Sequence, residues 1–327
     1  MSLEQGVFTI SLDFELFWGM RDKLKIQEYE QNLMGVGLVV PKLLDSFEKY
    51  NIHATWATVG FLFFQNKEHL SQHMPSHLPM YLNEKLSPYQ YLVSSNNLDE
   101  KYHFAPDLIS LIRQKKGQEI GTHTFSHYYC LEKGQTEATF ASDISKAIEV
   151  AQNNGLELKS LVFPRNQWNQ EYLKTLRQLG ILCYRGNELG WLYTASSGRA
   201  HKIKRGLRLI DSYINLSGYH TYNTERCIND ELINLPASRF LRPYSKKMAL
   251  FDGLRLKRIT KAMDEAAKNK KIFHLWWHPH NFGINISQNM MFLTKILEHF
   301  KLLEAKRGMA CLNMGELSSL LGVAHGK

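Results

Sequence analysis

Two acidic residues stand at the end of the first apolar run of the chain. Residues 7–12 are rich in β-branched and aromatic side chains, and Asp13 and Glu15 follow them with one residue in between. Residues two apart in an extended backbone share a face, so we expect both carboxylates to point into one cleft. Carboxylates held close together resist joint ionisation unless a cation or an arginine lies beside them. Taken alone, the pattern also fits two solvated acids at a strand end.

Two histidines four residues apart follow another short apolar segment. Residues 119–127 read EIGTHTFSH, which places His123 and His127 one helical turn apart, so that both rings can reach one ion. Zinc accepts neutral imidazole, and a site with two histidines and one carboxylate leaves a position open for water. A bare H-x-x-x-H pattern is usually a coincidence. Its position directly after a strand and a glycine favours a metal site.

Two further polar clusters end apolar runs. Residues 163–167 read FPRNQ, where Arg165 is able to hold a carboxylate bidentately, with an ordinary surface arginine as the alternative. Residues 274–282 read HLWWHPHNF, and three histidines and two tryptophans in nine residues are hard to explain by core packing. His274 lies inside the predicted strand and fits a packing role. For His278 and His280 a functional role is favoured.

These clusters need elements that bring them together. Seven apolar runs are typical of buried parallel strands, at residues 7–12, 53–59, 119–121, 158–163, 181–184, 208–210 and 271–277. Helical spacing predicts helices between and after them, at residues 36–50, 140–154, 170–179, 254–269 and 290–303. Strands that alternate with helices favour a mainly parallel sheet, and seven of them indicate a barrel. Functional residues in such barrels lie at the carboxyl ends of the strands.

The alternation is interrupted between residues 65 and 106, a stretch with four prolines and many polar and aromatic residues. We read residues 1–327 as a single catalytic domain in which residues 65–106 form an insertion over the barrel mouth. A lid and a plain surface excursion are equal alternatives for this stretch. Residues 212–250 form a second irregular region.

Composition narrows the classes of function. The chain has 327 residues, 44% hydrophobic and 22% charged, and a formal charge of +9, which favours anionic partners such as pyrophosphate-linked sugars. Its basic runs are too short for a nucleic-acid arm, and no apolar run approaches the ~18 residues of a membrane span. The four cysteines are far apart, as expected of reduced thiols. We therefore expect a cytoplasmic protein with no nucleic-acid partner and no stable membrane insertion.

Together these motifs resemble the polysaccharide deacetylase family, also called the NodB-homology or carbohydrate esterase family 4 group. Residues 53–60 resemble its second-strand signature, residues 118–127 resemble its histidine motif, and the motifs follow the family order over residues 7 to 282. The resemblance implies an α/β fold, a distorted (β/α)₇ barrel of the polysaccharide deacetylase type, which the strand count permits. It also implies a metal-dependent hydrolase that removes an acetyl group.

The resemblance further implies a role for each motif residue. Asp13 matches the catalytic base, Arg165 the arginine that orients it, and His278 the general acid. One divalent ion, zinc first and cobalt, nickel or manganese as alternatives, would be bound by Glu15, His123 and His127. The candidates for substrate binding are Asn166, Trp191, His280 and Asn281. The arginine motif reads Phe-Pro-Arg where the family has Phe-Arg-Pro, and Phe14 separates the two acids that are adjacent in many members.

The expected reaction is hydrolysis of an acetylated sugar, nucleotide- or lipid-linked sugars included, in the synthesis of a surface polysaccharide such as O-antigen or capsule. The ion would polarise the acetyl carbonyl and acidify a water molecule, Asp13 would take the proton, and His278 would protonate the leaving group. Trp18, Trp191 and Trp277 are candidate stacking faces for a sugar ring. Two alternatives stay open: a hydrolase of another C–N amide bond, in a cyclic amide or an N-acyl small molecule, and a non-catalytic glycan-binding barrel.

Overall fold

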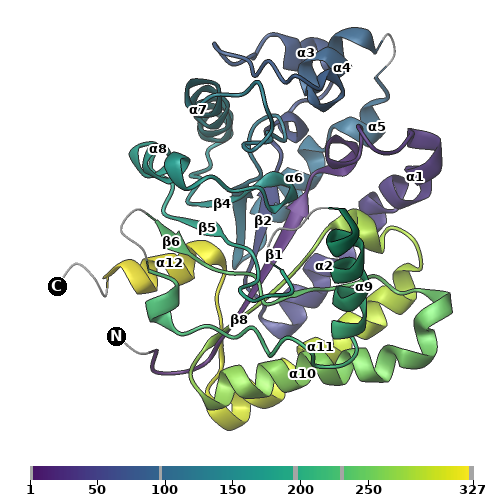
Figure 1. Cartoon of the computed structure of the whole chain (residues 1–327), viewed down its shortest axis with the longest axis vertical. Coiled ribbons are helices and arrows are strands. Elements are labelled where there is room, and N and C mark those ends of the chain that lie inside the picture. The colour runs from purple at the N-terminus through teal and green to yellow at the C-terminus, as the bar shows by residue number, and fades with distance from the viewer. Residues whose placement is uncertain (1–2, 96–97, 194–197, 229–231, 324–327) are drawn as a thin grey trace.

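A curled parallel sheet forms the centre of the molecule. The computed structural model describes residues 3–95, 98–193, 198–228 and 232–323. The strand order is β6-β5-β4-β3-β2-β1-β8-β7, β9 pairs with the start of β1, and the named ladders are parallel (Figure 1). The strands are β1 (Val7–Phe14), β2 (Ala54–Thr58), β3 (Gln118–Thr122), β4 (Ser160–Val162), β5 (Cys183–Arg185), β6 (Ile233–Asn234), β7 (Arg239–Phe240), β8 (Ile272–Trp277) and β9 (Ala310–Cys311).

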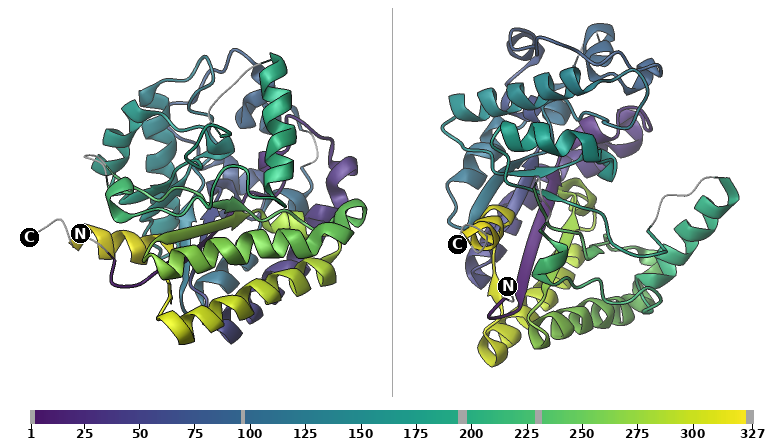
Figure 2. Two further views of the ribbon diagram at one scale, coloured as in Figure 1. Left: turned by 60° about the horizontal axis from the view of Figure 1, so that its bottom comes forward. Right: turned by 60° about the vertical axis from the view of Figure 1, so that its left-hand side comes forward.

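The curled sheet forms a half-barrel, and helices surround it. This is the (β/α) type of fold that the sequence predicted. They are α1 (Ile26–Met34), α2 (Val36–Tyr50), α3 (Lys67–Ser71), α4 (Pro88–Ser94), α5 (Glu100–His103), α6 (Pro106–Arg113), α7 (Glu137–Asn153), α8 (Leu173–Gln178), α9 (Gly198–Asp211), α10 (Asp252–Lys268), α11 (Ile286–Arg307) and α12 (Met314–Val323). Helices α10 and α11 lie side by side under one face (Figure 2). No helix in the described ranges combines the length and the apolar character needed to cross a membrane.

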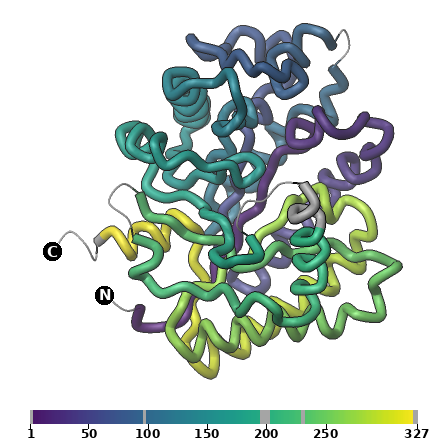
Figure 3. The backbone as a smooth tube through the Cα atoms, viewed as in Figure 1, coloured from purple at the N-terminus to yellow at the C-terminus, as the bar shows by residue number. Residues whose placement is uncertain are grey.

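The central strands are buried on both faces. Every residue of β1 and of β8 is buried, which is why these strands are near-continuous apolar runs rather than alternating ones. Helix α2 spans the predicted residues, and its apolar stripe packs into the core because 3.6-residue spacing places those side chains on one face. The chain leading into β1 and helix α12, near the two ends of the described sequence, lie at the same side of the sheet (Figure 3).

One predicted strand is wrong. Residues 208–210 form the last turn of α9, where Leu209 and Ile210 are 40% and 47% exposed. Three residues are too few to distinguish a strand from one face of a helix by periodicity. Strands β6, β7 and β9 were not predicted, because two-residue strands carry no periodic signal.

The described part of residues 65–106 contains three short helices, α3 to α5, and a 3₁₀ turn, and α6 begins at Pro106. The Trp18 indole donates a hydrogen bond to the His103 carbonyl at 2.7 Å, and the Arg21 guanidinium donates one to the Leu86 carbonyl. Trp18 belongs to a 3₁₀ turn, Leu16–Gly19, that directly follows Glu15. The inserted segment is therefore attached to the part of the chain that continues from the candidate metal ligand.

Asp211 is a buried carboxylate at the end of α9. It accepts hydrogen bonds from Arg239 at 2.7 Å and from the backbone N–H groups of Leu216 and Ser217 at 2.9 Å each, with Arg258 at 3.5 Å. Burial opposes its ionisation, but the two guanidinium groups and these hydrogen bonds lower its pKa overall. Asp211 therefore joins α9 to β7 and α10 as a carboxylate.

We expect Asp211→Asn to lower the free energy of unfolding by about 3 kcal/mol at pH 7, because it leaves two buried guanidinium groups without their counter-charge. Because the pKa of Asp211 is lower in the folded state, its ionised carboxylate stabilises the fold at pH values above the unfolded pKa of about 3.9. This stabilisation is lost as the pH falls through the folded-state pKa. The difference in free energy of unfolding between the wild type and Asp211→Asn should therefore become smaller below about pH 4. Urea unfolding at pH 7 and pH 3 measures it. Asp264→Asn, which removes an exposed partner of His299, is the control and should change little. Equal stability of Asp211→Asn and wild type at pH 7 would contradict the assignment.

Candidate metal centre and active site

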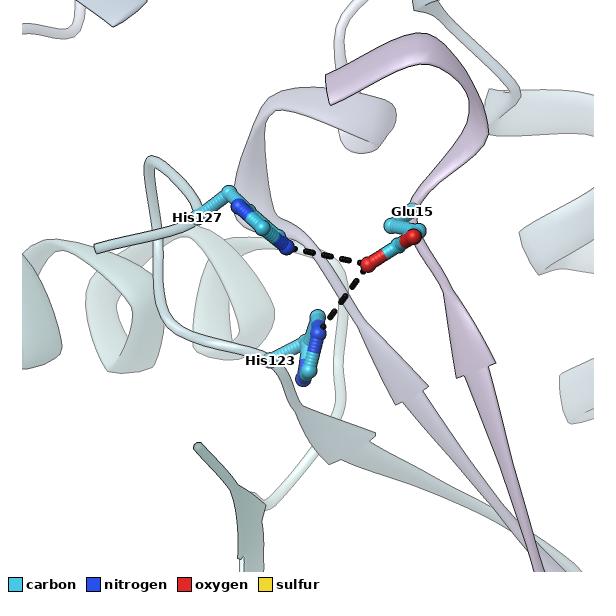
Figure 4. Close-up of side chains that lie close together, drawn as sticks. All are labelled: Glu15, His123 and His127. Atoms are coloured by element: carbon cyan, nitrogen blue, oxygen red, sulfur yellow. Dashed lines mark hydrogen bonds and ion pairs between the residues drawn. The ribbon is translucent and has the colours of Figure 1, made fainter. Parts of the chain in front are cut away.

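Three buried side chains converge at the carboxyl ends of the strands. One carboxylate oxygen of Glu15 lies 2.9 Å from Nε2 of His127 and 3.2 Å from Nε2 of His123 (Figure 4). One donor atom from each residue lies within 4.8 Å of the other two. Glu15 follows β1 and His123 follows β3, and these strands run parallel on either side of β2. The predicted ligand set is thus brought together in one place.

The histidines meet through a tight loop and not through the helical turn that the spacing suggested. Thr124 and His127 have left-handed backbone conformations, with φ of 64° and 59°. Such conformations are costly for residues other than glycine and gather at functional sites. The carboxylate of Asp143 on α7 supports the loop by accepting the N–H groups of Phe125 at 2.7 Å and Ser126 at 3.2 Å.

Glycine is required on the other side of the cluster. A Cβ atom on Gly19 would overlap the carboxylate of Glu15. Only glycine at this position lets the 3₁₀ turn close against Glu15 while the carboxylate keeps its place beside the histidines.

The protonation of the cluster suits a divalent cation. His123 donates from Nδ1 to the Val162 carbonyl at 2.8 Å, so Nε2 is the nitrogen that faces Glu15, and that Nε2 has no hydrogen-bond partner. Burial lowers the pKa of His127 to about 4, so its ring is neutral near pH 7. Burial opposes ionisation of Glu15, yet His278 and the two other histidines lower its pKa well below the usual range. One carboxylate and two imidazoles, each fixed through its second nitrogen or its surroundings, form a donor set for zinc.

Asp13 is held by an arginine that the sequence motifs did not single out. Arg185, the last residue of β5, donates from both terminal nitrogens to the two oxygens of Asp13, at 2.6 and 2.7 Å. Burial raises the pKa of Asp13, but the Arg185 charge, with His123 and His278, lowers it overall. Ser11 accepts from Arg185 at 3.0 Å and lies 2.9 Å from His274. Asp13 is therefore an oriented carboxylate.

The prediction that Arg165 holds Asp13 does not agree with the structure. The Arg165 guanidinium binds Asp22 and lies 4.2 Å from the centre of the Tyr129 ring. The backbone at Arg165 is left-handed, with φ of 56°, and this turn directs the side chain toward Asp22. Arg185 could have been found from its position, because it directly follows the predicted strand at residues 181–184. Arg165 likewise follows the predicted strand at residues 158–163.

The remaining predicted residues lie at different depths. Asn166 accepts a hydrogen bond from Arg185 at 3.1 Å and so reaches the site. Nε2 of His278 lies 3.5 Å from Glu15 and 3.7 Å from Asp13, with 22% of its side chain exposed. The buried His280 ring, a candidate for substrate binding, stacks on His278 with centroids 5.0 Å apart.

Asn281 and the tryptophans complete the comparison. Asn281 donates to the Tyr29 hydroxyl at 3.1 Å. Trp18 and Trp277 are fully buried in the core and offer no stacking face, whereas Trp191 is 57% exposed. The indole nearest the site is Trp276, which lies 4.1 Å from the Arg185 guanidinium and was not among the stacking candidates.

The molecule is an α/β half-barrel in which an arginine-paired aspartate and a histidine lie beside a candidate metal cluster. Residues 34–184 match the family described as Polysaccharide deacetylase. The resemblance seen in the sequence motifs is thereby confirmed, and this segment belongs to the polysaccharide deacetylase family. No curated protein matches the chain in sequence.

Solved structures share the fold at low identity. A protein assigned as a polysaccharide deacetylase from Mycobacterium smegmatis is 14% identical with a TM-score of 0.60, and the match covers 99% of this chain and 93% of that one. One from Pseudomonas aeruginosa PAO1 is 11% identical with a TM-score of 0.54, covering 98% and 92%. An allantoinase is 10% identical with a TM-score of 0.54, covering 98% and 91%. Because deacetylases and an allantoinase share the fold, the fold alone does not choose the substrate.

Proposed function

We propose that the chain is a metal-dependent deacetylase that hydrolyses the acetyl group of an acetylated sugar. The observation that carries the proposal is the position of Asp13, fixed bidentately by Arg185, beside the cluster of Glu15, His123 and His127. A base, an arginine that keeps it ionised, a ligand set and a partly exposed histidine are the parts that metal-assisted hydrolysis needs.

The side chains divide the work as follows. Glu15, His123 and His127 would hold a divalent cation, which would supply Lewis acidity toward a carbonyl oxygen and toward water. Asp13 accepts the proton of the attacking water, since Arg185 keeps it ionised and oriented. His278 delivers a proton to the departing nitrogen or oxygen of the sugar. Its Nε2 lies 3.5 Å from Glu15, and 22% of its side chain is exposed.

We also propose a place for this activity. Its substrate would be an intermediate of surface polysaccharide synthesis, and the protein would act in the cytoplasm as one catalytic domain. The four cysteines support a reducing compartment, since all are free thiols, and burial raises the pKa of each to about 12. Residues 65–106, tied to the turn after Glu15, would form a wall of the substrate site.

The test is acetate release from a panel of N- and O-acetylated sugars by the zinc-loaded protein and by the protein treated with a chelator. We expect release that depends on the cation. Ring opening of cyclic amides without acetate release would favour the second enzyme class. Saturable sugar binding without turnover of any substrate would favour a binding barrel and would overturn the proposal.

We expect saturating Zn²⁺ to raise the melting temperature, since a ligand at 100 times its Kd stabilises by about 2.7 kcal/mol. Glu15→Gln and His123→Ala should abolish the shift, because each removes a donor. His77→Ala, which removes an exposed histidine of the inserted segment, is the control and should keep it. Differential scanning fluorimetry measures the shift, and a full shift in Glu15→Gln would exclude Glu15 as a ligand.

We expect His278→Ala to lower kcat by about 10²-fold, the lower end of the range for a general acid. His280→Ala should have a smaller effect on kcat, because His280 is buried behind His278 and burial lowers its pKa to about 3, which leaves it without a proton to give. Steady-state kinetics on one acetylated sugar compares the two. The opposite ranking would assign the general acid to His280.

A further inference from the structure

A strongly basic cavity opens beside His278. It has a volume of about 250 Å³. Three arginines line it: Arg208 from α9, Arg239 from β7 and Arg242 just after that strand. Glu188 is the one acidic residue among the described residues that line it. Typical sites for drug-sized ligands measure about 300–1,000 Å³, so this cavity suits a single compact group.

Arg239 has hydrogen-bonding capacity that the described part of the protein leaves unused. Its side chain is 3% exposed, and one terminal nitrogen donates to Asp211 at 2.7 Å. Its Nε and its other terminal nitrogen are buried and have no hydrogen-bond partner. A buried donor without an acceptor costs about 1–3 kcal/mol, more when the group is charged. Such an arrangement is expected where a ligand supplies the acceptor.

The other two arginines each use Nε in a hydrogen bond to a neutral protein group, so their positive charge remains available to an anion in the cavity. Arg242 donates from Nε to the hydroxyl of Ser212 at 2.7 Å, and Arg208 donates from Nε to the Leu192 carbonyl at 3.0 Å. Burial lowers the pKa of Arg242, and the neighbouring charge of Arg239 adds to this effect. An anion placed among these side chains would therefore relieve repulsion as well as satisfy donors.

The acid in the cavity does not cancel this charge. Glu188 accepts a hydrogen bond from the Trp276 indole at 3.4 Å, and burial raises its pKa. Asp211 balances part of the charge of Arg239, but it is shared with Arg258. The three arginines of the lining thus remain in excess over its one acid.

The cavity shares a wall with the reaction site. His278 and Asn166 line it, and the same Asn166 accepts a hydrogen bond from Arg185, the partner of Asp13. The Trp276 ring, also in the lining, packs against the His278 ring with centroids 5.7 Å apart. A substrate whose acetyl group reaches Asp13 and His278 would place its next substituent in this cavity.

We propose that the cavity is an anion subsite for a phosphate group of the acetylated substrate, a sugar phosphate ester or diphosphate. The inference rests on the proposed deacetylation. Phosphate is favoured over carboxylate because several oxygens spread over a tetrahedron can serve three guanidinium groups, whereas a carboxylate is satisfied by one bidentate arginine. A nucleotide-linked sugar and a lipid-linked sugar share this chemistry.

The first test is kinetic and compares an N-acetylhexosamine 1-phosphate with the matching neutral methyl glycoside. For the wild type we expect kcat/KM to be at least about 10-fold higher with the phosphate. Arg208→Gln and Arg242→Gln should remove this preference by raising KM for the phosphate, and leave the neutral glycoside unaffected. Arg307→Gln, which removes an exposed arginine at the end of α11, is the control and should keep it. Equal rates for both sugars, or a preference that survives in both variants, would overturn the subsite.

The second test does not depend on turnover. Calorimetry of the zinc-loaded protein with inorganic phosphate and pyrophosphate should show binding that weakens with salt and is lost in the Arg208→Gln/Arg242→Gln double variant. Binding that persists in the double variant would place the anion at the metal and contradict the subsite. Phosphate binding without acetate release from any sugar would leave the subsite standing and refute the deacetylase. Uridine diphosphate sugars compared with sugar phosphate lipids in vesicles then identify the source of the phosphate.

Discussion

Asp13→Asn is expected to lower kcat by about 10²–10⁴-fold and to leave zinc bound. The amide keeps the size of the carboxylate but lacks the basic oxygen that accepts the proton of water. Glu15, His123 and His127 keep their mutual contacts, because none of their donor atoms depends on Asp13. Steady-state kinetics and the metal content of the purified variant measure the two outcomes.

A second aspartate provides the matched control. Asp22 also pairs with an arginine, Arg165, but no hydrogen bond or ion pair in the described part of the chain joins it to the candidate ligands. Asp22→Asn should keep kcat within a few-fold of the wild type. An Asp13→Asn protein with near-normal kcat would exclude Asp13 as the base, and one that loses its zinc would make Asp13 a ligand.

The sequence predicted those parts of the site that depend on local spacing. Asp13 and Glu15 both approach His278, as expected of residues two apart in extended backbone. His123 and His127 converge as expected, although by a loop with left-handed residues that spacing does not reveal. Parallel strands bring their carboxyl ends to one edge whatever their order along the chain.

The sequence did not predict what depends on the path of the chain after each strand. Arg165 and Arg185 both follow strands, and only the backbone of the turn decides which guanidinium reaches Asp13. The arginine cavity was hidden for a related reason. Arg208 was assigned to a strand and lies on α9, while Arg239 and Arg242 stand in a stretch that showed no period. Long-range packing, which no local pattern encodes, places the three together.

Replacing Arg165 and Arg185 one at a time tests which arginine serves Asp13, and we expect kcat to differ clearly between the two variants. Arg185→Met should lower kcat by about 10²–10³-fold, about 2.7–4.1 kcal/mol in the barrier, because Asp13 loses the charge that keeps it ionised and the two hydrogen bonds that orient it. Arg165→Met, which removes the partner of Asp22 at the surface of the same site, should change kcat only a few-fold.

Rescue by lysine separates positioning from folding. Arg185→Lys restores the charge beside Asp13 but not the two parallel hydrogen bonds, so its kcat should lie between those of Arg185→Met and the wild type. KM should change little in the series, since both terminal nitrogens of Arg185 are engaged by Asp13. A fold defect alone would reduce the fraction of active protein equally for every substrate and would not follow the charge at position 185. If Arg165→Met proved the more damaging change in kcat with zinc content preserved, the arginine that serves the base would be Arg165, and the pairing of Arg185 with Asp13 would be structural.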